Sequence, residues 1–149
     1  MKIGDVCNRI VIYVHEDESV QRAAELMRKY HVGNLVVTEL DDERQMPVGI
    51  VTDRDIVVEV IAKGVDPNEL TVGDIMSKEL ELASEGDDVS DVLDAMRESG
   101  IRRMPVVDSA GALVGVLALD DLLQLYAADL STIAAIVGTQ RHRESAARA

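Results

Sequence analysis

The stretch Val72-Gly73-Asp74-Ile75 decides the fold, because it repeats the pattern Ile3-Gly4-Asp5-Val6, which stands 69 positions earlier in the chain. The same separation joins further pairs: Glu16 with Glu85, Val20 with Val89, Met27 with Met96, and Val37 with Val106. A loop at 39–46 is three residues longer in the first half, and after it the separation becomes 66, which pairs Gly49 with Gly115 and Asp55 with Asp121. Self-similarity at a fixed period indicates a repeat architecture, so the chain contains two copies of one unit.

Each copy has the periodicity of a short α+β unit. Apolar residues at helical spacing predict a helix in each copy; they are Val20, Ala23, Ala24 and Met27, and then Val89, Val92, Leu93 and Met96. The expected N-caps are Asp17 or Ser19 and Asp87 or Asp88, and Gly33 and Gly100 lie near the expected ends. Aliphatic runs predict strand pairs at 35–38 with 48–51 and at 104–107 with 113–117. A second helix follows in each copy, ending at Gly64 in the first and running on toward Val137 in the second.

Composition restricts the class of partner. The 149 residues carry a formal charge of -13, which disfavours association with nucleic acid or with anionic membranes. No run of 18 uninterrupted apolar residues occurs, so we expect no membrane span. The single Cys7 cannot form an internal disulfide, and the N-terminus has no export-type pattern, so we expect a cytoplasmic protein.

One known family shows the same order of motifs. Val72-Gly73-Asp74-Ile75-Met76, an amphipathic helix, the stretch from Ile101-Arg102-Arg103 to Asp108, and an aspartate six residues after a glycine resemble a CBS domain, named after cystathionine β-synthase. The resemblance spans residues 3–127. It implies an α+β fold of two βαββα repeats, packed across a pseudo-twofold axis as a CBS pair, or Bateman module. It also implies two clefts, in which family members commonly bind AMP, ADP, ATP or S-adenosylmethionine and signal to a partner.

The resemblance assigns residues to both clefts. The first cleft would bring together Thr52, Asp55, Asp74, Lys78, Ile101, Arg102 and Arg103. The second would place Asp121 against Asp5, Arg9 and Val32. Ala118 replaces Thr52 and Gly33-Asn34 replaces Arg102-Arg103 in the second cleft, so we expect one competent site and a weaker or empty one.

The chemistry of the first cleft is readable without the family. Thr52 stands where a strand enters a helix, so its hydroxyl and nearby N–H groups favour a phosphate. Asp55 offers two acceptor oxygens for the hydroxyls of a ribose, and Arg102 and Arg103 offer forked donors for phosphate oxygens. Ile101 and Leu82 would supply apolar walls for adenine. The alternative interpretation is structural: Thr52, Asp55, Asp5 and Asp74 as caps, and the two arginines as surface residues with acidic neighbours.

No catalytic or metal-binding pattern accompanies these residues. His15, His31 and His142 lie in no catalytic motif, and Cys7 has no second ligand at metal spacing. Neither a Walker loop nor a dinucleotide fingerprint occurs. We therefore expect no metal, no obligatory cofactor and no catalysis by this chain.

The C-terminal end continues the helical stripe past the repeat. Leu130, Ile133 and Val137 are followed by a basic tail, which is either a frayed end or part of a helix that packs on a partner or a second copy. We favour the second, because the apolar stripe needs a cover. The predicted organisation is one repeat at 1–65, a second at 66–130, and a helical extension with a basic tail at 131–149.

Two function classes remain. The first is a regulatory sensor that binds an adenine nucleotide or S-adenosylmethionine and acts, as a homodimer, on an unidentified protein. The alternative is a nucleotide-independent scaffold that only dimerises, and a weaker third is a subunit of an enzyme whose catalytic chain is separate.

Overall fold

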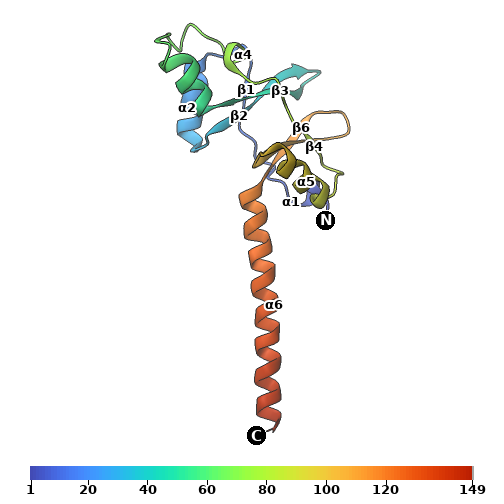
Figure 1. The fold of residues 1–149 in the computed structure, drawn as a ribbon. Coiled ribbons are helices and arrows are strands. Elements are labelled where there is room, and N and C mark those ends of the chain that lie inside the picture. The colour runs from blue at the N-terminus through green and yellow to red at the C-terminus, as the bar shows by residue number, and fades with distance from the viewer. Residues whose placement is uncertain (149) are drawn as a thin grey trace. The chain divides into compact units, whose positions relative to one another are not determined.

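The two copies form two three-stranded sheets flanked by helices. The computed structural model describes residues 1–148 and divides into two compact units, Met1–Leu117 and a second that begins at Ala118, each described by itself. The elements of the first copy are α1 (Ile3–Val6), β1 (Tyr13–His15), α2 (Val20–Tyr30), β2 (Asn34–Asp41), β3 (Arg44–Thr52), α3 (Asp53–Ile56) and the π-helical η1 (Val57–Ile61). Those of the second are α4 (Val72–Ile75), β4 (Ala83–Ser84), α5 (Val89–Ser99), β5 (Arg103–Val107), β6 (Leu113–Ala118) and α6 (Leu119–Arg148) (Figure 1).

The sheets have the same topology. Their strand orders are β1-β2-β3 and β4-β5-β6, and in each the first strand runs parallel to the second. β2 and β3 pair antiparallel. The predicted α+β class and the order strand, helix, strand, strand, helix are therefore confirmed, with a short helix, α1 or α4, before each copy's first strand.

The amphipathic helices α2 and α5 lie where the apolar periodicity predicts them. Ser19 caps α2, since its hydroxyl accepts a 3.1 Å bond from the Arg22 N–H. Asp88 holds the matching position before α5. α5 ends at Gly100 in the left-handed conformation (φ 68°), and α2 ends at His31 (φ 53°), two residues before Gly33. His31 thus has a backbone conformation that glycine usually adopts at a helix end.

The expected loop at 39–46 is wrong. β2 and β3 extend through it as a hairpin, pairing Glu39 with Met46 and Asp41 with Arg44. Its two-residue turn has positive φ at both Asp42 (51°) and Glu43 (67°), as a turn that matches the twist of a hairpin requires. The side chains there are mostly exposed and charged, so the sequence has no apolar alternation to indicate strands.

The lead segment of each copy packs on the other copy. Ile3 donates a backbone hydrogen bond to Asp87 (2.9 Å), and 69 residues later Val72 donates to Glu18 (2.8 Å). Val72 is fully buried in the core cluster of the first copy, whose members include Val14, Ala23, Met27, Leu35, Val37 and Val51. The two repeats thus exchange their first elements, and neither core is built from one repeat alone.

A pair of matched glycines lies where these lead segments cross the sheets. Ile50 forms an antiparallel bridge with Ser77, and Val116 forms the equivalent bridge with Asn8. A Cβ at Gly49 would lie 2.7 Å from the Ser77 carbonyl oxygen, and one at Gly115 would lie 2.9 Å from the Asn8 carbonyl oxygen. Each crossing therefore requires a residue without a side chain, and this explains why the repeat has glycine at both positions.

The second unit consists of the long helix α6. Within residues 1–148 it is the one helix that is long and apolar enough to cross a membrane, judged by length and composition alone. The stripe predicted to run on past the repeat is indeed helical through Arg148. The expectations of no membrane span and of a cytoplasmic location stay predictions.

Candidate functional site

A cleft of about 410 Å³ lies at the crossing between the two copies. Ile50 of β3 contributes one wall, and the other lining residues come from the second copy: Glu79, Leu80, Glu81, Ser99, Ile101 and Arg103. A volume of this size is within the range of small-ligand pockets. Because Ile50 also forms the bridge to Ser77, the same backbone position joins the copies and lines the cleft.

Local geometry explains how α5 and β5 place their residues in the cleft. The left-handed Gly100 ends α5, and the Ile101 N–H returns to the Met96 carbonyl at 3.1 Å. Arg103 begins β5 with an exposed side chain, while the next residue, Met104, is buried. The three residues that follow Arg103 in β5 are all buried, so the strand enters the core directly after Arg103 and the exposed guanidinium lies outside the core.

The segment after α4 closes the other side of the cleft. The Ser99 hydroxyl donates a hydrogen bond to the Glu81 carboxylate, which ties this segment to the end of α5. The lining then combines three apolar walls, from Ile50, Leu80 and Ile101, with one guanidinium and two carboxylates. Such a site suits a flat apolar ring that carries a polar tail.

Thr52 and Asp55 bind each other at the start of α3. The Thr52 hydroxyl accepts from the Asp55 N–H at 3.1 Å, and the Asp55 carboxylate accepts from the Thr52 N–H at 2.9 Å. This is a reciprocal capping box. One oxygen of the Asp55 carboxylate is used in this cap, and neither Thr52 nor Asp55 is among the residues that line the cleft.

The remaining residues assigned to the first cleft differ in where they lie. Ile101 and Arg103 line the cleft, and Lys78 and Leu82 flank the lining segment 79–81 without being part of it. The Asp74 carboxylate accepts from the Thr71 N–H at 2.8 Å, a capping contact like that of Asp55. Arg102 is exposed at the entrance to β5. The binding roles of all these residues stay predictions.

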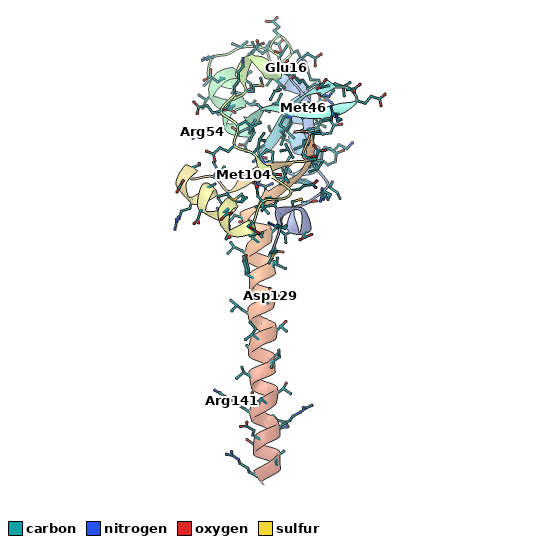
Figure 2. All side chains as sticks on the ribbon, turned by 90° about the vertical axis from the view of Figure 1, so that its right-hand side faces the viewer. Glu16, Met46, Arg54, Met104, Asp129 and Arg141 are labelled. Carbon is teal, nitrogen blue, oxygen red and sulfur yellow. The ribbon has the colours of Figure 1, made fainter. Side chains whose placement is uncertain are left out.

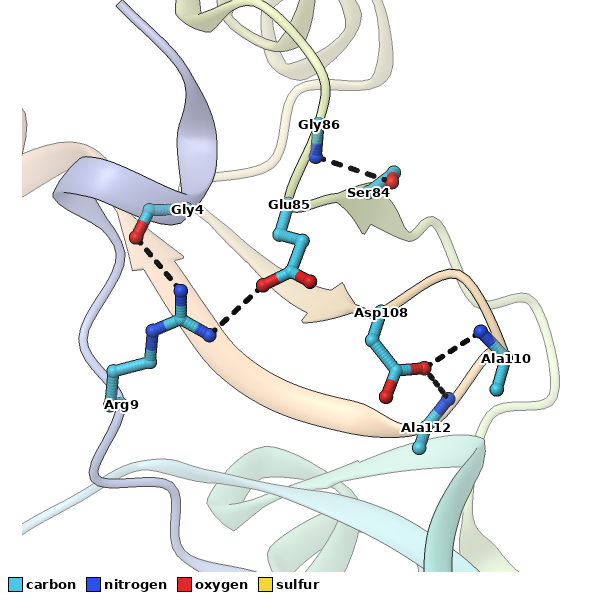
Figure 3. Close-up of polar contacts among 8 residues, drawn as sticks. All are labelled: Gly4, Arg9, Ser84, Glu85, Gly86, Asp108, Ala110 and Ala112. Atoms are coloured by element: carbon cyan, nitrogen blue, oxygen red, sulfur yellow. Dashed lines mark hydrogen bonds and ion pairs between the residues drawn. The ribbon is translucent and has the colours of Figure 1, made fainter.

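The residues assigned to the second cleft are differently engaged. Arg9 donates to the Gly4 carbonyl at 2.9 Å and pairs with the Glu85 carboxylate at 3.2 Å, as Figure 3 shows. Asp5 is exposed on α1, and Val32 packs against the first core cluster. Asp121 lies in the first turn of α6, in the other unit. Arg9, the cation expected to face a ligand in the second cleft, is thus paired with the Glu85 carboxylate of the same chain.

Sequence reasoning missed Ile50 and the lining residues Glu79, Leu80, Glu81 and Ser99. Carboxylates are frequent in this chain, with 28 acidic residues, so Glu79 and Glu81 carry no signal of their own. Ile50 had one available signal: it follows Gly49, whose match in both copies indicates a close backbone approach.

The described residues hold no group of three or more histidine, cysteine or acidic side chains placed to bind a metal ion.

A fold of two βαββα repeats with a cleft at their crossing defines the class of a CBS pair. The CBS domain model matches residues 3–62 and 72–128, so the chain belongs to the CBS domain family. Among its relatives, the uncharacterized protein MK0525 of Methanopyrus kandleri is 35% identical over 125 residues, which are 84% of this chain and 62% of that protein. The chain thus spans less than two thirds of that relative.

Two similar solved structures contain ligands. The CBS domain protein PAE2072 from Pyrobaculum aerophilum, complexed with AMP, has a TM-score of 0.71 and 28% identity over 82% of this chain and 90% of its own. The CBS domain pair of protein MJ0100, in complex with 5′-methylthioadenosine and S-adenosyl-L-methionine, has a TM-score of 0.71 and 26% identity over 87% and 98%. CBS pairs similar to this chain therefore bind adenosine-containing molecules.

Proposed function

We propose that this chain is a regulatory module, not an enzyme, which binds an adenosine-containing ligand in the cleft lined by Ile50, Ile101 and Arg103 and acts on a partner protein. The observation that carries the proposal is that both copies contribute to one cleft, which has apolar walls and a guanidinium. The AMP complex of PAE2072 and the S-adenosylmethionine complex of MJ0100 support the class of ligand.

The lining suggests how each part of such a ligand is held. The side chains of Ile50 and Ile101 offer aliphatic surfaces to the two faces of an adenine. Arg103 offers forked donors to a phosphate or a carboxylate. Thr52 and Asp55 follow Ile50 at the end of β3, and the second carboxylate oxygen of Asp55 accepts a ribose hydroxyl. The capping box then serves the ligand by fixing the Asp55 side chain in place.

The charge of the lining favours a ligand with few negative charges. Two carboxylates, Glu79 and Glu81, share the cleft with the single guanidinium of Arg103. A triphosphate brings its charges close to both carboxylates, and like charges in a partly desolvated site repel. We therefore propose that AMP or S-adenosylmethionine binds more tightly than ATP.

The second cleft is proposed to bind weakly or not at all. The repeat places Tyr30, Val32 and Asn34 where the first cleft has Ser99, Ile101 and Arg103. This replacement removes the cation, and Arg9 is already paired with Glu85. The expected stoichiometry is one ligand per chain.

Titration calorimetry of the whole chain with AMP, S-adenosylmethionine and ATP tests these statements. Arg103→Ala should weaken AMP binding at least about tenfold, because a charge-assisted hydrogen bond contributes about 1.5–3 kcal/mol. Arg97→Ala is the matched control, since Arg97 is an exposed arginine of α5 that pairs with Asp94 outside the cleft.

Each result has a distinct meaning. Equal weakening by both arginine variants contradicts the assignment of Arg103, and a stoichiometry of two contradicts the single site. No binding of any of the three ligands contradicts the sensor function and leaves the nucleotide-independent scaffold.

A further inference from the structure

α6 carries an apolar seam, defined here as Leu123, Tyr126, Leu130, Ile133 and Val137. The spacing of these residues alternates between three and four, which is the a and d pattern of a heptad repeat. Their side chains are between 39% and 67% exposed. The seam therefore has the spacing of a coiled coil, and its residues are exposed on the helix.

The residues beside the seam suit close packing of a second helix. Ala127 and Ala134 follow Tyr126 and Ile133 at the flanking e positions, and their small side chains allow two helices to approach closely. Ala128 and Ala135 lie on the opposite face. The seam thus consists of large apolar side chains, whereas Ala128 and Ala135 on the opposite face are small; Ile136, which is 63% exposed, adds an apolar side chain outside the seam.

The charges of α6 are complementary when two copies of the helix lie antiparallel. Residues 119–133 contain three aspartates and no basic residue, whereas residues 134–148 contain three arginines and one glutamate. Figure 2 shows Asp129 and Arg141 in these two halves. Two copies running in opposite directions place acidic halves against basic halves, whereas two parallel copies place Arg141 and Arg143 beside their own counterparts.

We propose that the seam of α6 binds the seam of a second copy of this chain in an antiparallel coiled coil. A twofold axis across the helix pair makes both partners use the same patch, which is the symmetry of most homodimers. The proposal commits to a protein partner and not to a lipid bilayer, because Asp129 interrupts the apolar stretch of α6 near its middle. It does not depend on the proposed ligand or on its cleft.

Sedimentation of the whole chain without ligand tests the pairing. Leu130→Glu with Ile133→Glu should halve the sedimented mass. Ala128→Glu with Ala135→Glu, which adds the same charge to the opposite face of the same helix, should leave the mass of a dimer unchanged. Circular dichroism of both variants checks that the chain remains folded. A wild-type monomer, or a dimer that survives the seam variant, overturns the proposal.

Spin labels test the direction of the helices. In a Cys7→Ser, Ala146→Cys chain, antiparallel pairing that crosses near Leu130 separates the two labels by on the order of 40–50 Å, at about 1.5 Å per residue. Parallel pairing brings them within about 20 Å, since packed helix axes lie about 10 Å apart. The short distance overturns the antiparallel arrangement. Flotation of the wild-type chain with lipid vesicles, in place of dimerisation, overturns the protein partner.

Discussion

Replacing Gly49 by alanine should destabilise the first unit through one backbone contact. The added Cβ would lie 2.7 Å from the Ser77 carbonyl oxygen and 2.8 Å from the Met76 sulfur. The methionine side chain is flexible and can move without loss, but the carbonyl can move only if the two backbone hydrogen bonds between Ile50 and Ser77, of 3.0 and 2.9 Å, are broken. The substitution therefore forces the lead segment of the second copy away from β3.

The size of the effect follows from three terms. Loss of the two hydrogen bonds costs about 1 kcal/mol each, and overpacking adds about 1–3 kcal/mol. Alanine also lowers the conformational entropy of the unfolded chain, which stabilises the folded state by about 0.4–1 kcal/mol. We expect the free energy of unfolding to fall by about 2–5 kcal/mol, and the affinity for AMP to fall as well, because Ile50 and residues 79–81 line the cleft.

Urea denaturation followed by circular dichroism measures the loss. Gly86→Ala is the matched control, because the nearest atom to its added Cβ is 3.9 Å away and its φ is not in the left-handed region. The control should be more stable than the wild type by about 0.4–1 kcal/mol, because only the reduced freedom of its unfolded chain changes. Equal unfolding midpoints for the two variants would show that a side chain at position 49 does not clash with the Ser77 carbonyl.

Three further substitutions test local features, each by the change in unfolding midpoint. Glu43→Gly should stabilise the hairpin of β2 and β3 by about 1 kcal/mol, because φ at Glu43 is 67°. His31→Gly should stabilise the end of α2 by about 0.5–1 kcal/mol for the same reason, with φ at 53°. Thr52→Ala should destabilise α3 by about 1 kcal/mol through loss of its cap. A destabilised glycine variant, or an unchanged Thr52→Ala, would contradict the corresponding feature.

The fold was predictable because the pattern of apolar side chains and the repeat between the two halves are both visible in the sequence. The helical periodicity around Met27 and Met96, and the separation of matched residues, survive in the sequence without any structure. The hairpin at 39–46 was missed because it extends beyond the core, where strand pairing is carried by backbone groups and the exposed side chains show no alternation. The turn residues Asp42 and Glu43 are also not the Asn-Gly pair that marks such a turn.

The candidate site was predictable only in part, for a related reason. Ile101 and Arg103 differ from their counterparts Val32 and Asn34, so the repeat draws attention to them. Ser99 is the last residue of α5, where a serine carries no signal of a binding site. Only its hydrogen bond to Glu81 shows that it helps to shape the cleft. Helix caps and ligand sites also use the same residue types. The sequence therefore could not decide whether Thr52 and Asp55 cap a helix or bind a ligand.

The exchange of lead segments links ligand binding to the association of the two copies. A chain cut between the predicted repeats at 65 and 66 would leave Val72 on one piece and its core partners, such as Val14, on the other. The reverse applies to Ile3, whose hydrogen bond reaches Asp87. Neither piece can complete its core, so the pair folds as one unit. The ligand proposed to lie between Ile50 and Ile101 would contact both halves of that unit, and its binding free energy would add to the stability of the crossing. The proposed ligand would therefore strengthen the association of the two repeats within the chain.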